Sequence, residues 1–215
     1  MTTVEHSQRT HGSTYPTLRT VSRSGEITAL LRRIQAGDRD AVAELTPLVY
    51  DDLKLIAKQQ RAKWRGDDTM SVTVLVHDAY MRMIDRTQAE WFSSAHFFAV
   101  ASRAMRQLLV SYARRRQALK RGGDAAKVTD HHLTDDDQID LILSVDQALE
   151  QLSGFSEPQA RIVEARFFAG LTEHEIATSM GVSDRTVRRE WTKARAWLRS
   201  TLDPEYVSRL EPDPA

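Results

Sequence analysis

Apolar side chains recur at the spacing of an α-helix along most of the chain, and no stretch alternates with the period of two that a β-strand requires. The helical patterns cover residues 26–36, 41–57, 71–84, 95–116, 139–152, 157–169, 173–180 and 184–198. The first 24 residues are rich in Thr, Ser, His and Arg without any such period, so we expect them to be disordered. The chain is therefore predicted to be all-α.

Local signals sharpen the N-terminal part of this prediction. Asp38 precedes the second pattern and is a candidate N-cap. Pro47 lies inside that pattern, where it is expected to kink or split the helix. The pattern over 71–84 is strongly apolar, and Asp78 and Arg82 fall on one face of it. We therefore expect a buried helix with a single polar stripe there.

The longest pattern, over 95–116, is amphipathic. On a helical wheel its core side carries Phe97, Ala101, Ala104, Leu108 and Tyr112. The opposite side carries Arg103, Arg106, Gln107 and Arg114. We therefore expect one face in the core and a basic face turned outward.

A composition change divides the chain into two modules. Residues 122–138 begin with Gly-Gly, contain an Asp-Asp-Asp run and lack an apolar stripe, which predicts a flexible, extended acidic linker. The predicted organisation is a disordered extension (1–24), a first helical module (25–121), the linker (122–138), a second helical module (139–202) and an acidic tail (203–215). In the second module, Ser156 with Gln159 and Thr172 with Glu175 each have the spacing of a helix capping box.

Residues 173–188 have the pattern of a helix-turn-helix. Gly181 stands where the tight turn needs a residue that tolerates positive φ, and Ser183 can cap the second helix. Inward positions of the motif and its second helix are assigned to Ile176, Met180, Val182, Val187, Trp191, Ala194 and Leu198. The residues left outward are Asp184, Arg185, Arg188, Arg189, Thr192 and Lys193. A recognition helix contacts bases with its N-terminal residues and phosphates with its basic ones, so this unit predicts DNA binding.

Charge is balanced over the 215 residues, with 30 Lys and Arg against 30 Asp and Glu, but it is segregated along the chain. Residues 91–123 hold seven basic side chains and no acid, 124–140 hold six acids and one Lys, and 183–200 hold six basic side chains and two acids. Two basic regions separated by an acidic one favour two binding sites over a uniform surface.

Cysteine is absent, which excludes disulfides, thiolate metal sites and thiol nucleophiles. No apolar run approaches the roughly 20 residues of a membrane span, and no signal-peptide core is present. We therefore expect a cytoplasmic protein without a metal or cofactor.

Together these segments resemble the bacterial sigma factors of the sigma-70 family, extracytoplasmic-function (ECF) subgroup. The resemblance is carried by residues 27–50, by Leu75-Val76-His77-Asp78-Ala79-Tyr80-Met81-Arg82-Met83, by His96 to Arg116 and by the helix-turn-helix, in the family's order. It implies two helical domains, region 2 and region 4, and a non-enzymatic subunit that brings core RNA polymerase to promoter DNA.

The resemblance also implies site residues. Contacts with the clamp of the polymerase β′ subunit fall on His77, Asp78, Met81 and Arg82. Contacts with the promoter −10 element, where the strands open, fall on Arg103, Arg106, Gln107, Tyr112, Arg114 and Arg115. Contacts with the −35 element fall on Ser183, Asp184, Arg185, Thr186, Arg188, Arg189, Thr192 and Lys193. Region 4 is also expected to meet the β flap, and both an anti-sigma factor and the terminal extensions remain candidate regulators.

Two other functional classes fit the sequence less well. A response-regulator-like transcription factor needs a ligand pocket or an α/β receiver domain, and no strand pattern is present. A nuclease needs a rigid catalytic cluster, whereas residues 135–137 lie in the predicted linker. Because acidic segments flank the basic ones, we also expect the linker and tail to cover the basic faces of the free protein, and core polymerase to expose them.

Overall fold

The computed structural model describes residues 23–63, 70–84, 91–121 and 134–204. Every regular element in these ranges is helical, which confirms the predicted all-α class. The expectations for residues 1–22, for 122–133 of the linker and for 205–215 of the tail lie outside the described residues.

The helices follow the predicted patterns closely. In chain order they are α1 (Ser24–Gln35), α2 (Asp40–Lys63), α3 (Val72–Ile84), α4 (Ser94–Arg121), α5 (Thr134–Phe155), α6 (Glu157–Val163), the π-helical segment η3 (Glu164–Phe168), α7 (Glu173–Met180) and α8 (Asp184–Thr201). The start of α5 differs from the expectation of an extended linker up to residue 138. Helix α5 begins at Thr134, so residues 134–138 are helical and not extended.

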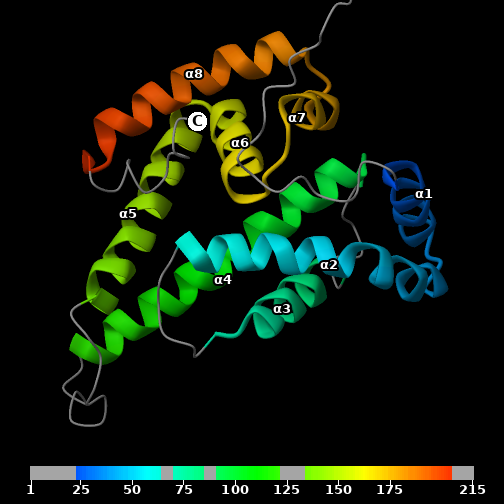
Figure 1. Ribbon diagram of the computed structural model, residues 1–215, viewed down its shortest axis with the longest axis horizontal. Coiled ribbons are helices and arrows are strands. Elements are labelled where there is room, and N and C mark those ends of the chain that lie inside the picture. Colours follow the sequence, from blue (N-terminus) through cyan, green and yellow to red (C-terminus); the bar gives the residue numbers. More distant parts are fainter. Residues whose placement is uncertain (1–22, 64–69, 85–90, 122–133, 205–215) are drawn as a thin grey trace, which may run out of the picture.

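Helix α4 is the central element of the molecule (Figure 1). It packs against α1, α2 and α3 on one side and against α5, η3 and α7 on the other. The buried apolar residues of both modules form one continuous cluster. The second module therefore lies directly on α4 instead of standing apart from it.

Polar side chains fix the corners and crossings of the first module. Asp38 caps α2 as predicted, because its Oδ1 accepts from the backbone N–H groups of Asp40 at 3.0 Å and Ala41 at 3.3 Å. Helix α2 continues through Pro47 without splitting. The buried Gln60 amide of α2 donates to the backbone carbonyl of Ser102 in α4 at 3.0 Å and so ties these two helices together.

The turn between α7 and α8 forms as its sequence predicts. Thr172 and Glu175 make both hydrogen bonds of the capping box at the start of α7. Gly181 ends α7 with φ 67° and ψ 33°, in the left-handed region. Ser183 then caps α8 by accepting from the backbone N–H of Thr186 at 3.2 Å. Each signal is local in sequence, so it acts independently of the distant packing.

We expect Gly181→Ala to lower the free energy of unfolding by about 1 kcal/mol, because an L-residue is strained at this φ. No neighbouring atom lies within 4 Å of an added Cβ, so the loss is conformational. Gly154→Ala in α5 is the matched control, since it also meets nothing within 4 Å and has no positive φ. Urea denaturation measures both changes, and equal shifts would contradict the assigned role of Gly181.

Candidate nucleic-acid interface

The first half of α8 presents a polar, basic surface. All six residues predicted to face outward are exposed, namely Asp184, Arg185, Arg188, Arg189, Thr192 and Lys193. On the inner side of α8, Val187 and Ala194 are buried and Trp191 is half-buried. The Arg166 guanidinium lies over the Trp191 ring, with its Cζ 4.9 Å from the ring centroid. The inward assignment of Val182 is wrong, since its side chain is 39% exposed in the turn beyond the end of α7.

Glu173 organises two arginines beside this surface. Its carboxylate accepts from Arg166 at 2.9 Å and from Arg188 at 2.9 Å. Burial acts to raise the pKa of Glu173, but the hydrogen bonds from Arg166 and Arg188 outweigh it and hold the pKa below its ordinary value. Arg188 stays well exposed, so it can exchange this carboxylate for a phosphate or a base edge.

Glu190 has a similar role for two further cations. It lies 3.0 Å from Arg189 and 3.1 Å from Lys193, and it accepts from the Gln159 amide at 2.8 Å. The hydrogen bond from Gln159, followed by that from Lys193, lowers the pKa of Glu190 to about 2. The predicted capping box of Ser156 and Gln159 is therefore wrong, because the Ser156 side chain makes no cap and Gln159 binds α8 instead.

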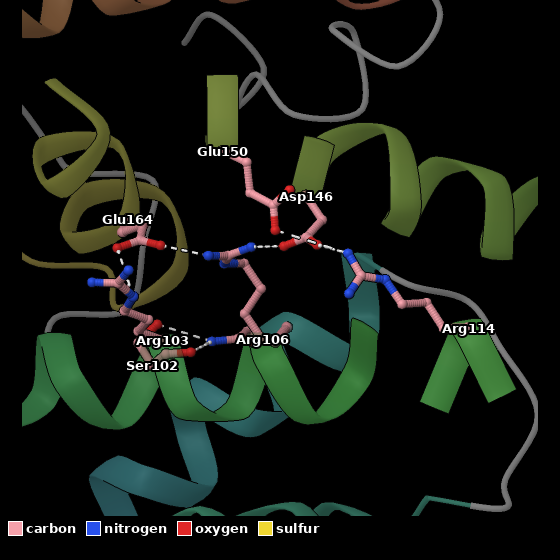
Figure 2. Close-up of polar contacts among 8 residues, drawn as sticks. Ser102, Arg103, Arg106, Arg114, Asp146, Glu150 and Glu164 are labelled. Atoms are coloured by element: carbon pink, nitrogen blue, oxygen red, sulfur yellow. Dashed lines mark hydrogen bonds and ion pairs between the residues drawn. The ribbon is translucent and has the colours of Figure 1, made fainter. Parts of the chain in front are cut away.

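The predicted basic face of α4 is divided between solvent and the second module. Arg103, Gln107, Arg114 and Arg115 are exposed. Arg106, which the helical wheel placed outward, is only 7% exposed and points into the junction between the modules (Figure 2). The outward placement of Arg106 is thus wrong for this arrangement, whereas contact of these residues with DNA stays a prediction.

Arg106 joins an ion cluster formed by side chains of α4, α5 and η3. The members of this cluster are Arg103, Arg106, Arg114, Asp146, Glu150 and Glu164. One terminal nitrogen of Arg106 donates to Asp146 of α5, and the other donates to Glu164 of η3 at 2.6 Å. Figure 2 shows the Arg106 side chain rising from α4 between these two carboxylates. The planar Arg106 guanidinium thereby binds two acids that lie on different helices.

The two flanking arginines extend the cluster toward solvent. Arg114 donates to Asp146 at 3.0 Å and lies 3.8 Å from Glu150, and Arg103 lies 3.8 Å from Glu164. Both arginines are more than half exposed, so these outer contacts are screened by water and weak. The buried contacts of Arg106 with Asp146 and Glu164 are therefore the strong part of the cluster.

A signal for this burial was present in the sequence. Val110 falls between Arg106 and Arg114 on the same side of the helical wheel, and it is buried. An apolar residue inside a basic face indicates that part of the face is covered. Tyr112, predicted to stack on a base, is half-buried, and its hydroxyl accepts from Arg116 at 3.1 Å.

The outer surface of α3 is partly apolar. Leu75, Val76, Ala79 and Met83 are buried, whereas His77, Met81 and Arg82 are exposed and Asp78 is half-buried. The prediction of a buried helix with one polar stripe is therefore wrong, because neighbouring helices cover only one side of α3. Two apolar side chains remain in water, Val74 at 46% and Met81 at 44% exposure.

Between α2 and α3 this surface is hollowed. A groove of about 200 Å³ is lined mainly by apolar atoms, with Val49, Tyr50, Val76, His77 and Tyr80 among its walls. In the described part of the chain, no three or more His, Asp or Glu side chains come together as a metal site would need. Among those same residues, no helix has the length and apolar character to cross a membrane.

Comparison with known protein families identifies the family that has this order of helices and this helix-turn-helix. The model of the ECF sigma factor family matches residues 24–204, which include every helix described above. No curated protein matches the chain. Sigma factors of this family bind RNA polymerase and direct the initiation of transcription at promoters. The chain belongs to the ECF sigma factor family.

Proposed function

We propose that this sigma factor recognises the −35 element through α8, binds and opens the −10 element along α4, and docks on the polymerase clamp through α3. The observation that carries the proposal is the helix-turn-helix of α7 and α8, whose second helix begins with exposed polar and basic side chains. The terminal extensions and an anti-sigma factor stay candidate regulators.

Recognition of the −35 element is supported by the geometry of α8. Its first turn carries Asp184, Arg185 and Thr186, which can reach base edges if the helix N-terminus enters the major groove. Arg189 and Lys193 follow on the exposed side, where they suit phosphates. Ion pairs with Glu173 and Glu190 limit the motion of the cations that would contact DNA, and so reduce the side-chain entropy lost on DNA binding. These cations are Arg188, Arg189 and Lys193.

Binding of the −10 element is supported by the length and charge of α4. Its 28 residues span about 42 Å. Arg103, Gln107, Arg114 and Arg115 are exposed along it and can contact a backbone. Strand opening costs a few kcal/mol for each base removed from the stack. Tyr112 offers a ring to a released base if Arg116 moves aside.

Docking on polymerase is supported by the α3 surface. Val74, Met81 and the charged Arg82 are exposed on α3, and His77 of the same helix lines the groove. An apolar centre with a polar rim is typical of protein interfaces. In the second module Phe155 is 85% exposed at the end of α5, and it is a candidate contact for the β flap.

Run-off transcription with core RNA polymerase from a related bacterium, on a pool of genomic promoters, tests the proposal directly. We expect transcripts that depend on the protein and share motifs at −35 and −10. Direct binding of duplex DNA without any polymerase-dependent transcript would instead indicate an ordinary repressor or activator.

We expect Arg188→Ala to weaken binding of the holoenzyme to −35 promoters by about 1–3 kcal/mol. Glu173 keeps its contact with Arg166 in this variant, so the fold should be retained. Competition among single-base −35 variants separates a lost base contact, which relaxes one position, from a lost phosphate contact, which weakens all sequences equally. Arg32→Ala on α1 is the control with the same charge change at an exposed site. Unchanged promoter binding would reject the placement of the recognition helix.

We expect Met81→Lys to weaken binding to core polymerase by on the order of 2 kcal/mol, about 30-fold in Kd, because a charge would be buried in the contact. The thermal midpoint should stay unchanged, since the side chain is exposed in the free protein. Met81→Leu, which keeps the volume and apolar character, is the matched variant and should bind normally. Fluorescence anisotropy measures the affinity of the labelled unaltered protein and of both variants for core polymerase. Equal affinities of the unaltered protein and Met81→Lys would contradict docking through this surface.

A further inference from the structure

We infer that a pocket between α4, α6, η3 and α7 binds a short aliphatic carboxylic acid that also carries an uncharged hydrogen-bonding group. The pocket measures about 180 Å³, and its walls come from all four elements. Sites for drug-sized ligands measure roughly 300–1,000 Å³, so only a small molecule fits here. The inference goes beyond the proposed function, which leaves this pocket without a role.

His96 of α4 brings an unmet hydrogen bond to this pocket. Its ring is part of the wall, and its Nδ1 is buried without a hydrogen-bond partner among the residues that the structure describes. Burial, reinforced by the positive charge of Arg161, holds the pKa of His96 below its ordinary value, so the ring is uncharged at neutral pH. An uncharged ring nitrogen pairs with a neutral group such as a hydroxyl, and leaving it buried without one costs free energy.

Neighbouring aromatic rings hold the His96 ring in place. The ring centroid of Phe92 lies 5.2 Å from that of His96, and the centroid of Trp91 lies 6.1 Å from it. The backbone N–H of His96 also donates to Ser93 Oγ at 3.1 Å, close to the start of α4. A ring that is already fixed by packing loses little conformational entropy when a ligand binds it.

Arg161 of α6 supplies the charge for an anion. Its side chain is exposed, and it makes no hydrogen bond or ion pair within the described ranges of the chain. Arg103 of α4 lines the same pocket and approaches Glu164 only to 3.8 Å (Figure 2). A carboxylate matches the planar fork of a guanidinium with two parallel hydrogen bonds. Arg161 is therefore the anchor that we assign to the acid group of the ligand.

The acids of the pocket favour a ligand with a single negative charge. Glu157 and Glu164 both belong to the walls, and Glu164 is already paired with Arg106 at 2.6 Å. Arg103 and Arg161 then face the carboxylate of Glu157 alone, which leaves one positive charge in surplus. A carboxylate balances this surplus. A phosphate group carries about −1.5 to −2 charges at pH 7 and exceeds it.

The remaining walls suit a short hydrocarbon chain. Ala99 and Val100 of α4, Ala165 of η3 and Met180 of α7 contribute apolar surface to the pocket. Removal of methyl groups from water is favourable, and a methionine side chain adapts to the shape of its neighbour. The ligand that uses all of these features has a carboxylate, one neutral polar group and a small branched chain.

Ligand-detected nuclear magnetic resonance with the full chain tests the pocket. The probe is 2-hydroxy-3-methylbutanoate, which combines a carboxylate, a hydroxyl and a branched hydrocarbon chain. We expect saturation transfer from the protein to the methyl groups of the probe, with a Kd of about 1 mM or tighter. Inorganic phosphate at equal concentration should not displace the probe. Absence of transfer at about ten times that concentration of probe, or displacement by phosphate, would overturn the inference.

Arg161→Gln tests the anchor of the carboxylate, because it removes the charge and keeps a polar side chain. We expect binding of the probe to weaken by about tenfold or more. The thermal midpoint should stay unchanged, since Arg161 is exposed and unpaired within the described residues. Arg32→Gln on α1 makes the same charge change at another exposed site and should bind the probe normally. Equal affinity of Arg161→Gln and the unaltered protein would place the probe elsewhere and reject the site.

His96→Phe tests the neutral hydrogen bond, because it keeps the ring against Phe92 and removes the ring nitrogens. A second probe, 3-methylbutanoate, lacks the hydroxyl. We expect the unaltered protein to prefer the hydroxy acid by about fivefold, and His96→Phe to lose this preference while it still binds 3-methylbutanoate. An unchanged preference in the variant would contradict the role of His96. These measurements need neither polymerase nor promoter DNA, so their outcome is independent of the proposed function.

Discussion

A guanidinium removed from water needs anions around it, and this requirement for Arg106 shapes the junction of the molecule. The charge would cost several kcal/mol if it were buried without partners. Asp146 and Glu164 supply them from separate helices of the second module. Because both carboxylates must reach one planar fork, the packing of α5 and of η3 against α4 is fixed together. The apolar residues packed around this junction belong to one continuous core of the described residues.

Local features of the fold were predictable from the sequence, whereas the junction was not. Thr172, Gly181 and Ser183 act on backbone groups within a few residues, so their positions suffice to place the helix-turn-helix. Gln159 failed as a capping residue because Glu190, far along the chain, offers it a charged acceptor. The helical wheel placed Arg106 outward, opposite the apolar side of α4. Val110 on the same side indicates that part of this face is covered. The carboxylates that bind Arg106 lie 40 and 58 residues away along the chain, and no local pattern identifies them.

The two basic surfaces differ in how their charges are held. On α8 the cations bind Glu173 and Glu190, which lie on α7 and on α8 itself. On α4 Arg106 binds Asp146 of α5 and Glu164 of η3, so its charge is held across the junction with other helices.

The π-helical turn at Glu164–Phe168 is a place where the chain can lose one residue without turning the helices that follow. Its backbone bond from Ala169 to the Glu164 carbonyl, at 3.3 Å, encloses one residue more than an α-helical turn does. Removing a residue from an ordinary helix rotates everything beyond it by about 100°. Here the loss of one residue would relax the wide turn to an α-helical one and leave the helix-turn-helix in register. Such a deletion would change how the buried Glu164 is presented to Arg106, while the direction of the helices that follow is kept.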